Sequence, residues 1–276
     1  MIEASIAIIC SKADPASMNI RDKLLKMFNF KRIDEKAYGE DTFEFEGAVI
    51  ITMQRELLYA DDVESFVKAK YLIFASRHAA ESGMPAFLAH TPGNWTDEAP
   101  YGGKPRSICI AMPLHLRRAI LILEKLRHEM GFDDWRCGLE VTHHGPYIEK
   151  TPAMFIELGS TLNEWKNDKA GEVIAQAIME LVNADTEVNC TVATGFGGPH
   201  YAPQFNRLIL NEKIAIGHII PKYVFPSITK REVKMAIERT SIRPSTALID
   251  WKGLKSSERQ IVLEACNEIG IEVKKI

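Results

Sequence analysis

The chain has 276 residues, of which 46% are hydrophobic and 26% charged, a composition that excludes a disordered or fibrous protein. Its 34 basic and 37 acidic residues give a net charge of −3, which argues against binding nucleic acid by bulk positive charge and leaves a local basic patch open. No apolar run approaches the roughly 20 residues that span a bilayer, and the N-terminus lacks a signal peptide's basic region, so we expect a cytoplasmic protein without a membrane partner.

Apolar runs of strand length alternate with amphipathic runs of helix length. In chain order the sequence predicts a strand at 5–10, a helix at 15–28, a strand at 47–52, a helix at 60–70, strands at 71–76 and 107–112, a helix at 115–130, strands at 137–142 and 154–159, a helix at 166–183, strands at 189–194 and 213–220, a helix at 229–240, a strand at 246–250 and a helix at 256–269. Asp14 before Pro15 is typical of a helix start, and Gly270 of a helix end.

The predicted strands are continuously rich in Ile, Val and Ala, as in sheets that are covered on both faces. This pattern predicts a three-layer α/β/α fold with a mainly parallel or mixed sheet. Neither a low-complexity linker nor an internal repeat divides the chain, so we expect a single domain over residues 1–276. The stretch 77–106 lacks helical periodicity and contains His, Arg and Trp, which favours a functional loop.

Polar residues follow several predicted strands, where ligands of α/β proteins usually bind. These residues are Arg77 and His78, His143 and His144, Glu157 at the end of its strand, His200 after the glycine-rich turn 195–198, and His90, which follows the short apolar run AFLA at 86–89. Histidine is the commonest neutral metal ligand and carries protons near neutral pH. Their common placement predicts a metal or acid/base site.

Each of these histidines also has a plainer interpretation as a loop residue that only forms hydrogen bonds. Side-chain alternation lets only one of His143 and His144 face a given site easily, and we expect this to be His144. His218 is typical of a buried, hydrogen-bonded core residue and His128 of a solvated helix face, whereas His115 fits either setting.

Other motifs are weaker. The turn at 194–201 has three glycines that would let backbone N–H groups approach an anion, but it is neither a dinucleotide-binding nor a P-loop pattern. Basic residues cluster at several places, including Arg117 and Arg118, and Lys252 follows a strand beside Trp251, where a cation and a stacking surface suit a nucleotide. The five cysteines form no CxxC pair, which favours reduced, buried thiols.

The joint order of these motifs resembles one family. The segments SRH (76–78), HTPGN (90–94), HHGP (143–146), ELGST (157–161), GFGGPHY (195–201) and DWKGL (250–254), with the N-terminal run 11–20, are similar to D-aminoacyl-tRNA deacylases of the archaeal and plant type. The resemblance implies hydrolysis of the ester between a D-amino acid and the tRNA 3′ end, a zinc requirement, and a phosphorylase/hydrolase-like fold similar to peptidyl-tRNA hydrolase. Ala79 and Ala80 depart from the family pattern, in which polar residues are commoner.

We assign roles as hypotheses. The catalytic candidates are His78, His144, Glu157 and His200, and the candidate zinc ligands are His78, His90, His143, His144 and His200. The candidate substrate-binding residues are Arg77, Gly197, Gly198, Lys252, Arg117 and Arg118, where the N–H groups of Gly197 and Gly198 would receive an oxyanion or a phosphate. The partner would be the 3′ acceptor end of D-aminoacyl-tRNA, and we infer no obligate protein partner.

Two other classes of function remain open at this point. One is a nucleoside phosphorylase-like or zinc peptidase-like hydrolase of the same fold class, which fold alone does not separate. The other is a module that binds tRNA without cleaving it. The preferred D-amino acid, the rejection of L-forms and the oligomeric state do not follow from the sequence.

Overall fold

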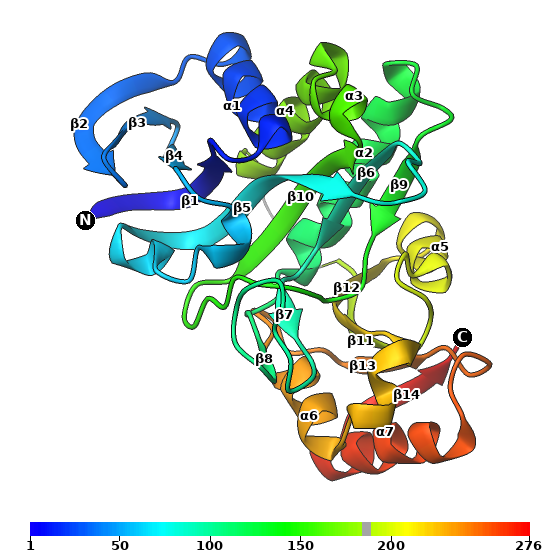
Figure 1. Ribbon diagram of the computed structural model, residues 1–276. Helices are drawn as coiled ribbons and strands as arrows, with labels where there is room; N and C mark the ends of the chain where they lie inside the picture. The colour runs from blue at the N-terminus through cyan, green and yellow to red at the C-terminus, as the bar shows by residue number, and fades with distance from the viewer. Residues whose placement is uncertain (184–188) are drawn as a thin grey trace.

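Eight strands form the larger of two main sheets in the computed structural model, which describes residues 1–183 and 189–276 (Figure 1). The order across the sheet is β2-β3-β4-β1-β5-β10-β6-β9. The strands are β1 (Ile2–Ser11), β2 (Lys31–Ala37), β3 (Glu40–Phe45), β4 (Ala48–Met53), β5 (Val67–Ala79), β6 (Ala86–His90), β9 (Arg136–Leu139) and β10 (Ala153–Ser160). The central strands β4, β1, β5 and β10 are mutually parallel.

The direction of the outer strands makes this sheet mixed. Strands β3 and β2 form an antiparallel extension at one edge, and β6 runs antiparallel to β10, with β9 parallel to β6. The predicted α/β class with a mainly parallel or mixed sheet is therefore confirmed. A short two-stranded sheet of β7 (Gly93–Asn94) and β8 (Ser107–Ile108) stands apart from it.

The smaller main sheet is entirely parallel, in the order β12-β11-β13-β14. Its strands are β11 (Thr191–Phe196), β12 (Ile214–Ile220), β13 (Thr246–Ile249) and β14 (Glu272–Lys275). The helices around it are α2 (Pro113–Glu129) and α5 (Pro203–Asn211) on one face and α6 (Lys230–Glu238) and α7 (Ser256–Ile269) on the other. This sheet has the expected helical layer on both faces.

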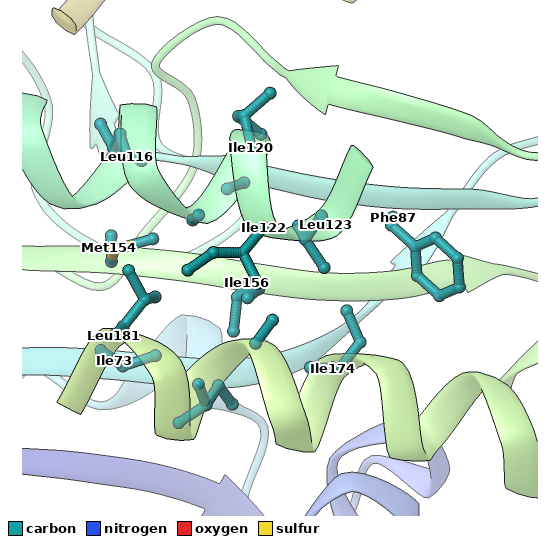
Figure 2. Close-up of a cluster of buried hydrophobic side chains, with 14 of the residues drawn as sticks. Ile73, Phe87, Leu116, Ile120, Ile122, Leu123, Met154, Ile156, Ile174 and Leu181 are labelled. Atoms are coloured by element: carbon teal, nitrogen blue, oxygen red, sulfur yellow. The ribbon is translucent and has the colours of Figure 1, made fainter. Parts of the chain in front are cut away.

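One face of the larger sheet packs against helices α1 (Pro15–Met27), α2 and α4 (Asp168–Val182), and a short helix α3 (Leu162–Trp165) precedes α4. Figure 2 shows Met154 and Ile156 of β10 between side chains of α2 and α4. Burial of this continuous apolar layer, at roughly 25 cal/mol per Å² of apolar surface, is the main favourable contribution to folding. The same cluster includes residues of β11 and β12, so it joins both sheets.

The opposite face of the larger sheet is covered differently. Ile9, Phe74 and Phe155 pack there against Leu57 and Val63 from two 3₁₀ turns, Leu57–Tyr59 and Val63–Ser65, rather than against long helices. The helix predicted at 60–70 is therefore wrong: the second turn leads directly into β5, whose first residues pair with β1 at Ile2 and Val67. Tertiary pairing outweighs the local helical pattern here. This face, free of helices, is where the candidate site lies.

Most other predicted elements are confirmed within one to four residues of their ends. The exceptions have physical causes. The strand predicted at 107–112 is only Ser107–Ile108, because Pro113 begins α2. The strand predicted at 137–142 ends at Leu139, since β9 pairs only with the short β6. Strands β2, β3, β6 and β14 and helix α5 are short, at four to nine residues, and were not predicted.

The helix ends follow the predicted chemistry. The Asp14 carboxylate accepts hydrogen bonds from the N–H groups of Ala16 and Ser17, and Pro15 occupies the first turn of α1. Gly270 ends α7 in the left-handed conformation at φ 74°, which glycine adopts without steric cost.

Two further predictions concern the cysteines and membrane-spanning segments. All five cysteines are free thiols, with Cys10, Cys109 and Cys266 buried and Cys137 and Cys190 half-buried. No helix among the described residues is long and apolar enough to cross a membrane.

Three histidines lie outside the candidate site. His218 is buried, with Nδ1 bonded to the Thr142 hydroxyl at 3.0 Å and Nε2 donating to the Arg239 carbonyl at 2.9 Å, as predicted for a core histidine. His128 is exposed on α2 and pairs with Glu124 and Asp133. His115 is buried against the Tyr71 ring, with ring centroids 4.3 Å apart, which settles its setting as structural.

His115 should make the fold sensitive to acid. Burial, with a smaller contribution from Arg118, lowers the pKa of His115 from 6.5 to about 4. Because the unfolded chain then binds the proton more readily, His115 contributes stability above pH 6.5 that is lost as the pH falls towards 4, on the order of 3 kcal/mol. In denaturant titrations at pH 7 and pH 4.5, His115→Phe should lose less stability than the wild type, whereas His128→Gln should lose as much. Equal losses in the wild type and His115→Phe would contradict this.

Candidate active site

A cavity of about 470 Å³ lies on the face of the larger sheet that the helices leave uncovered. Most of its lining residues are polar or charged, which is unusual for a wall of a sheet core. The lining residues are Asp14, Glu56, Leu57, Leu58, Ser76, Arg77, His78, Ala79, Tyr101, His143, His144, Glu157 and His200. Five of the predicted site residues therefore share one cavity with Arg77.

Three strands deliver the first group of side chains. Register pairs Gly159 with His78 and Phe155 with His90, and side-chain alternation puts Glu157 on the same face as Phe155. Glu157 thus lies within β10, between the two histidines and not at a strand exit. His90 ends β6, which runs against β10, so it arrives from the opposite direction to His78. Its ring stacks on Phe155 at 5.1 Å between centroids.

Loops deliver the second group. The segment after β9 carries His143 and His144, and Gly93 holds it by donating its N–H to the carbonyl oxygen of His144 at 2.7 Å. On its other side, Val141 donates to the carbonyl of His200 at 3.0 Å. His200 follows β11, so the smaller sheet contributes directly to the site. The larger and smaller sheets meet at these histidines.

Both His143 and His144 line the cavity, so the expectation that only one of them faces the site was wrong. The reason is local backbone geometry. His144 has φ 44°, in the left-handed region, which breaks the strand-like alternation after β9.

Three histidines of the site use the same ring nitrogen, Nδ1, to donate to a backbone carbonyl. The Nδ1 atoms of His90, His143 and His144 lie 3.2, 2.8 and 2.6 Å from the backbone carbonyls of Thr91, Val141 and Gly145, to which they donate as N–H groups. That tautomer leaves a lone pair on each Nε2, the usual arrangement of histidines that bind metals. The three side chains offer ligand atoms within 4.8 Å of one another.

Two buried atoms near these nitrogens lack hydrogen-bond partners among the described residues, namely His90 Nε2 and Glu140 Oε2. The carboxylate nearest to His90 Nε2 is Glu157 Oε1, at 3.5 Å. Unsatisfied buried polar atoms are costly, and these two would each gain a partner from an ion bound among the histidines and glutamates. The buried His/Glu clusters therefore fit a metal ion. Two further groups overlap with the first, one of Glu140, His143 and His200 and one of His78, Glu140 and Glu157.

Carboxylates connect the remaining histidines. His200 Nε2 lies 2.7 Å from Glu140 Oε1, and His78 Nδ1 lies 3.5 Å from Glu140 Oε2 and 3.4 Å from Glu157 Oε2. His78 Nε2 lies 3.2 Å from the Tyr201 hydroxyl. Glu140 thus joins His78 to His200, and His78 in turn joins Glu140 to Glu157.

The pKa values separate the histidines into two kinds. Burial opposes charge on His78, but Glu140 and Glu157 outweigh it and raise the pKa of His78 to about 11. Burial lowers the pKa of His144 to about 4, assisted by His90, and lowers that of His143 well below its ordinary value. His143 and His144 are therefore neutral at physiological pH, as metal-binding histidines must be.

The strand end that carries His78 is fixed by Asp14. The Asp14 carboxylate accepts from the Arg77 N–H at 2.8 Å and from the Ser76 hydroxyl at 3.2 Å, so the N-cap of α1 also anchors β5. Arg77 pairs with Glu56 at 2.7 Å and lies over the Trp165 ring at 5.7 Å. The indole N–H of Trp165 donates to the His78 carbonyl at 2.9 Å.

Comparison with known proteins agrees with this arrangement. A family model described as D-aminoacyl-tRNA deacylase matches residues 65–274. The chain belongs to the D-aminoacyl-tRNA deacylase family. A D-aminoacyl-tRNA deacylase of Thermococcus kodakarensis is 38% identical over 271 residues, which is 96% of this chain and 97% of the relative. That of Archaeoglobus fulgidus is 34% identical over 274 residues, 97% of this chain and 95% of the relative.

A solved structure has the same fold. The crystal structure of a conserved protein of unknown function superimposes with a TM-score of 0.91 at 31% identity, covering 100% of this chain and 96% of the other. Futalosine hydrolase of Helicobacter pylori covers 66% of this chain with a TM-score of 0.40 at 11% identity, a likeness too weak to carry an argument. The expected similarity to peptidyl-tRNA hydrolase stays a prediction.

Some residues predicted for this deacylase family member lie away from the cavity. Gly197 and Gly198 pack against Asp250 behind His200, and the Gly197 N–H already donates to the Ile220 carbonyl at 2.8 Å, which argues against its receiving an oxyanion. Lys252 is exposed in the turn after β13. Arg117 and Arg118 lie on α2, on the helix-covered face of the larger sheet, so they do not reach the histidines.

Three site residues were not predicted. Glu140 lies inside an apolar run and looked like part of a strand, Asp14 was assigned only as a helix cap, and Tyr201 was quoted only as part of a motif. A buried glutamate between apolar residues is itself a signal, because such a group needs a charged or hydrogen-bonded partner. Glu140 finds these partners in His78 and His200, 62 and 60 positions away along the chain.

Proposed function

We propose that the cavity hydrolyses the ester that joins a D-amino acid to the 3′ end of tRNA, with its histidines and carboxylates as the chemical groups. The chain's family supports this activity. The single observation that carries the proposal is that four histidines and the buried Glu157 line one cavity and form clusters with His90 and the buried Glu140. A module that only binds tRNA phosphates would have no use for such a cluster.

The same proposal includes a zinc ion. His90, His143 and His144 would hold it through their Nε2 atoms, since three histidines with an open fourth position are a usual catalytic zinc set. When bound, zinc supplies a Lewis acid that polarises a carbonyl oxygen and lowers the pKa of water. Zinc is favoured over magnesium or calcium because imidazole nitrogens, not only oxygens, form the group.

The protein's own groups then place and move protons. Glu157 lies between His78 and His90, and its carboxylate would accept a proton from the attacking water. His78, held against two carboxylates, would orient the ester through the side of its ring that bears Nε2. His200, half-buried at the cavity and bonded to Glu140, would donate a proton to the ribose oxygen that leaves. The proton taken up by Glu157 would replace it through His78 and Glu140, which connect Glu157 to His200. An aminoacyl ester is already activated, so positioning and charge stabilisation suffice.

The test of the function is an assay of D- and L-aminoacyl-tRNA carrying the same amino acid. We expect release of the D-amino acid and slower or absent release of the L-form. Turnover that requires phosphate and cleaves a nucleoside would instead support the phosphorylase-like alternative. Cleavage of peptides would support the peptidase-like one, and tight tRNA binding without cleavage the binding module.

Metal removal should separate the zinc proposal from the activity itself. We expect about one bound zinc ion per chain in the purified protein and loss of the metal in His143→Ala, with His128→Ala as the control outside the site. Chelation should lower turnover on the order of a hundredfold, the usual size of such electrostatic stabilisation, and added zinc should restore it. Undiminished turnover of metal-free protein would remove zinc from the mechanism and leave water positioned by Glu157.

A further inference from the structure

A second cavity, of about 570 Å³, adjoins the candidate active site. It lies between β9 and α5, and Tyr201 forms its border with the first cavity: the tyrosine lines the second cavity while its hydroxyl reaches His78 Nε2 at 3.2 Å. Leu88, Leu139 and the partly exposed Leu210 give it an apolar surface. A flat, apolar ligand would therefore fit beside the histidines.

Two arginines line this second cavity, and neither has a carboxylate partner within residues 1–183 and 189–276. The Arg136 guanidinium lies 3.9 Å from the centroid of the Tyr201 ring, a cation–π contact. Arg207 is exposed and forms no ion pair among the described residues. Arg77 and Arg106, by contrast, are paired with carboxylates, Arg77 with Glu56 and Arg106 with Asp97. Two unpaired cations at an apolar cavity favour an anionic ligand with flat rings.

We infer that the second cavity binds the unpaired nucleotides at the 3′ end of tRNA. This inference rests on the proposed function and adds the place where the leaving half of the substrate is held. A terminal base would stack on the platform of Arg136 and Tyr201, and Arg207 would contact a phosphate. Proteins bind unstacked bases of single-stranded RNA on aromatic rings and guanidinium planes in this way.

The position of Tyr201 links base and ester. One side of this residue faces the nucleotide cavity and its hydroxyl faces His78, so a base in one cavity and an ester in the other are separated by a single side chain. A ribose joins the same two groups in the substrate. His200, the neighbour of Tyr201, then lies beside the ribose oxygens.

The experiment compares two substrates in Arg207→Ala and Arg136→Ala. D-aminoacyl-tRNA carries the nucleotides, whereas the ethyl ester of the same D-amino acid does not. For tRNA, we expect KM to rise about tenfold in each variant with kcat unchanged, because a charge-assisted contact contributes about 1.5 kcal/mol. Ester hydrolysis should stay at the wild-type rate. The slope of log KM against log salt concentration should fall by roughly 0.7 in Arg207→Ala, as expected for one lost phosphate contact with a single strand.

A matched control and a direct binding measurement complete the test. Arg243→Ala removes an exposed arginine whose side chain donates to the Ile269 carbonyl, on α7 and away from both cavities, so it should leave KM unchanged. The trinucleotide CCA should bind the wild type and bind Arg207→Glu at least tenfold more weakly by calorimetry.

Three results would overturn the inference. Unchanged KM in both arginine variants would exclude the cavity as a nucleotide site. Equal slowing of tRNA and ethyl ester in Arg136→Ala, with Arg207→Ala silent, would show that Arg136 only positions Tyr201. Equal affinity of the wild type and Arg207→Glu for CCA would also exclude the cavity as a nucleotide site. Failure of the wild type to cleave D-aminoacyl-tRNA while CCA binding still depends on Arg207 would instead refute the proposed function alone.

Discussion

Replacing Glu157 by glutamine should lower kcat for D-aminoacyl-tRNA hydrolysis by about a hundredfold to a thousandfold, the range expected when a general base is lost. Glutamine keeps the size of the side chain but not its charge. In the wild type, burial opposes ionisation of Glu157, but the neighbouring imidazoles of His78 and His90 hold its pKa below the ordinary value, so the carboxylate is ionised at neutral pH. Single-turnover rates at saturating enzyme measure the loss directly, because they separate the chemical step from product release.

The matched control is Glu232→Gln. Glu232 is also buried, but it caps α6 and pairs with Arg106 away from the cavity. We expect Glu232→Gln to lower the melting temperature without changing the single-turnover rate. If Glu157→Gln retained the wild-type rate while folding normally, Glu157 would not be the base, and the pair of His200 and Glu140 would be the remaining candidate.

The elements that the sequence predicts well are those whose local signal agrees with their tertiary setting. Helix α1 begins where Asp14 caps it, and β1, β5 and β10 are apolar because both faces of the sheet are buried. The helix prediction for 60–70 failed because the helical pattern there competes with strand pairing between β1 and β5, which sequence periodicity does not reveal. Local propensity is a weak prior when two strands lie side by side.

The candidate site was predicted in part for the same reason. Strand ends are visible in a sequence, so His78, His143, His144 and His200 could be expected together. The sequence does not show that β6 runs antiparallel to β10, so the contact between His90 and Glu157 could not be predicted. Glu140 could not be paired with its histidines before the packing of β9 against the loop after β11 was known, because no sequence spacing joins them.

Close contacts between strand backbones could not be predicted from the sequence either. The motif ELGST was noted for Glu157, yet its Gly159 is required by the packing of two strands. Strands β5 and β10 pair Gly159 with His78, and a Cβ atom added at position 159 would lie 2.6 Å from the His78 Cβ and 2.8 Å from its carbonyl oxygen. Both neighbours are close to the backbone and cannot rotate away. Only glycine lets the two strands approach while His78 keeps its place.

Gly159→Ala should therefore lower both stability and activity. Overpacking of this kind costs about 1–3 kcal/mol, which predicts a melting temperature lower by several degrees. The activity loss should be larger than stability explains, on the order of a hundredfold in kcat, because the strands can accept the methyl group only by moving His78, and misplacement by about 1 Å has that effect. Thermal unfolding and single-turnover kinetics on the same preparation measure the two quantities.

Gly39→Ala distinguishes a general loss of stability from a local one. Gly39 lies in the turn between β2 and β3 at φ 77°, and a Cβ atom there would meet no other atom within 4 Å. Alanine strains that backbone by about 1 kcal/mol without approaching the cavity, so the variant should be less stable yet hydrolyse D-aminoacyl-tRNA at the wild-type rate. A wild-type kcat in Gly159→Ala would mean that β5 and β10 can separate without displacing His78, and the close approach of the two strands would then have no part in catalysis.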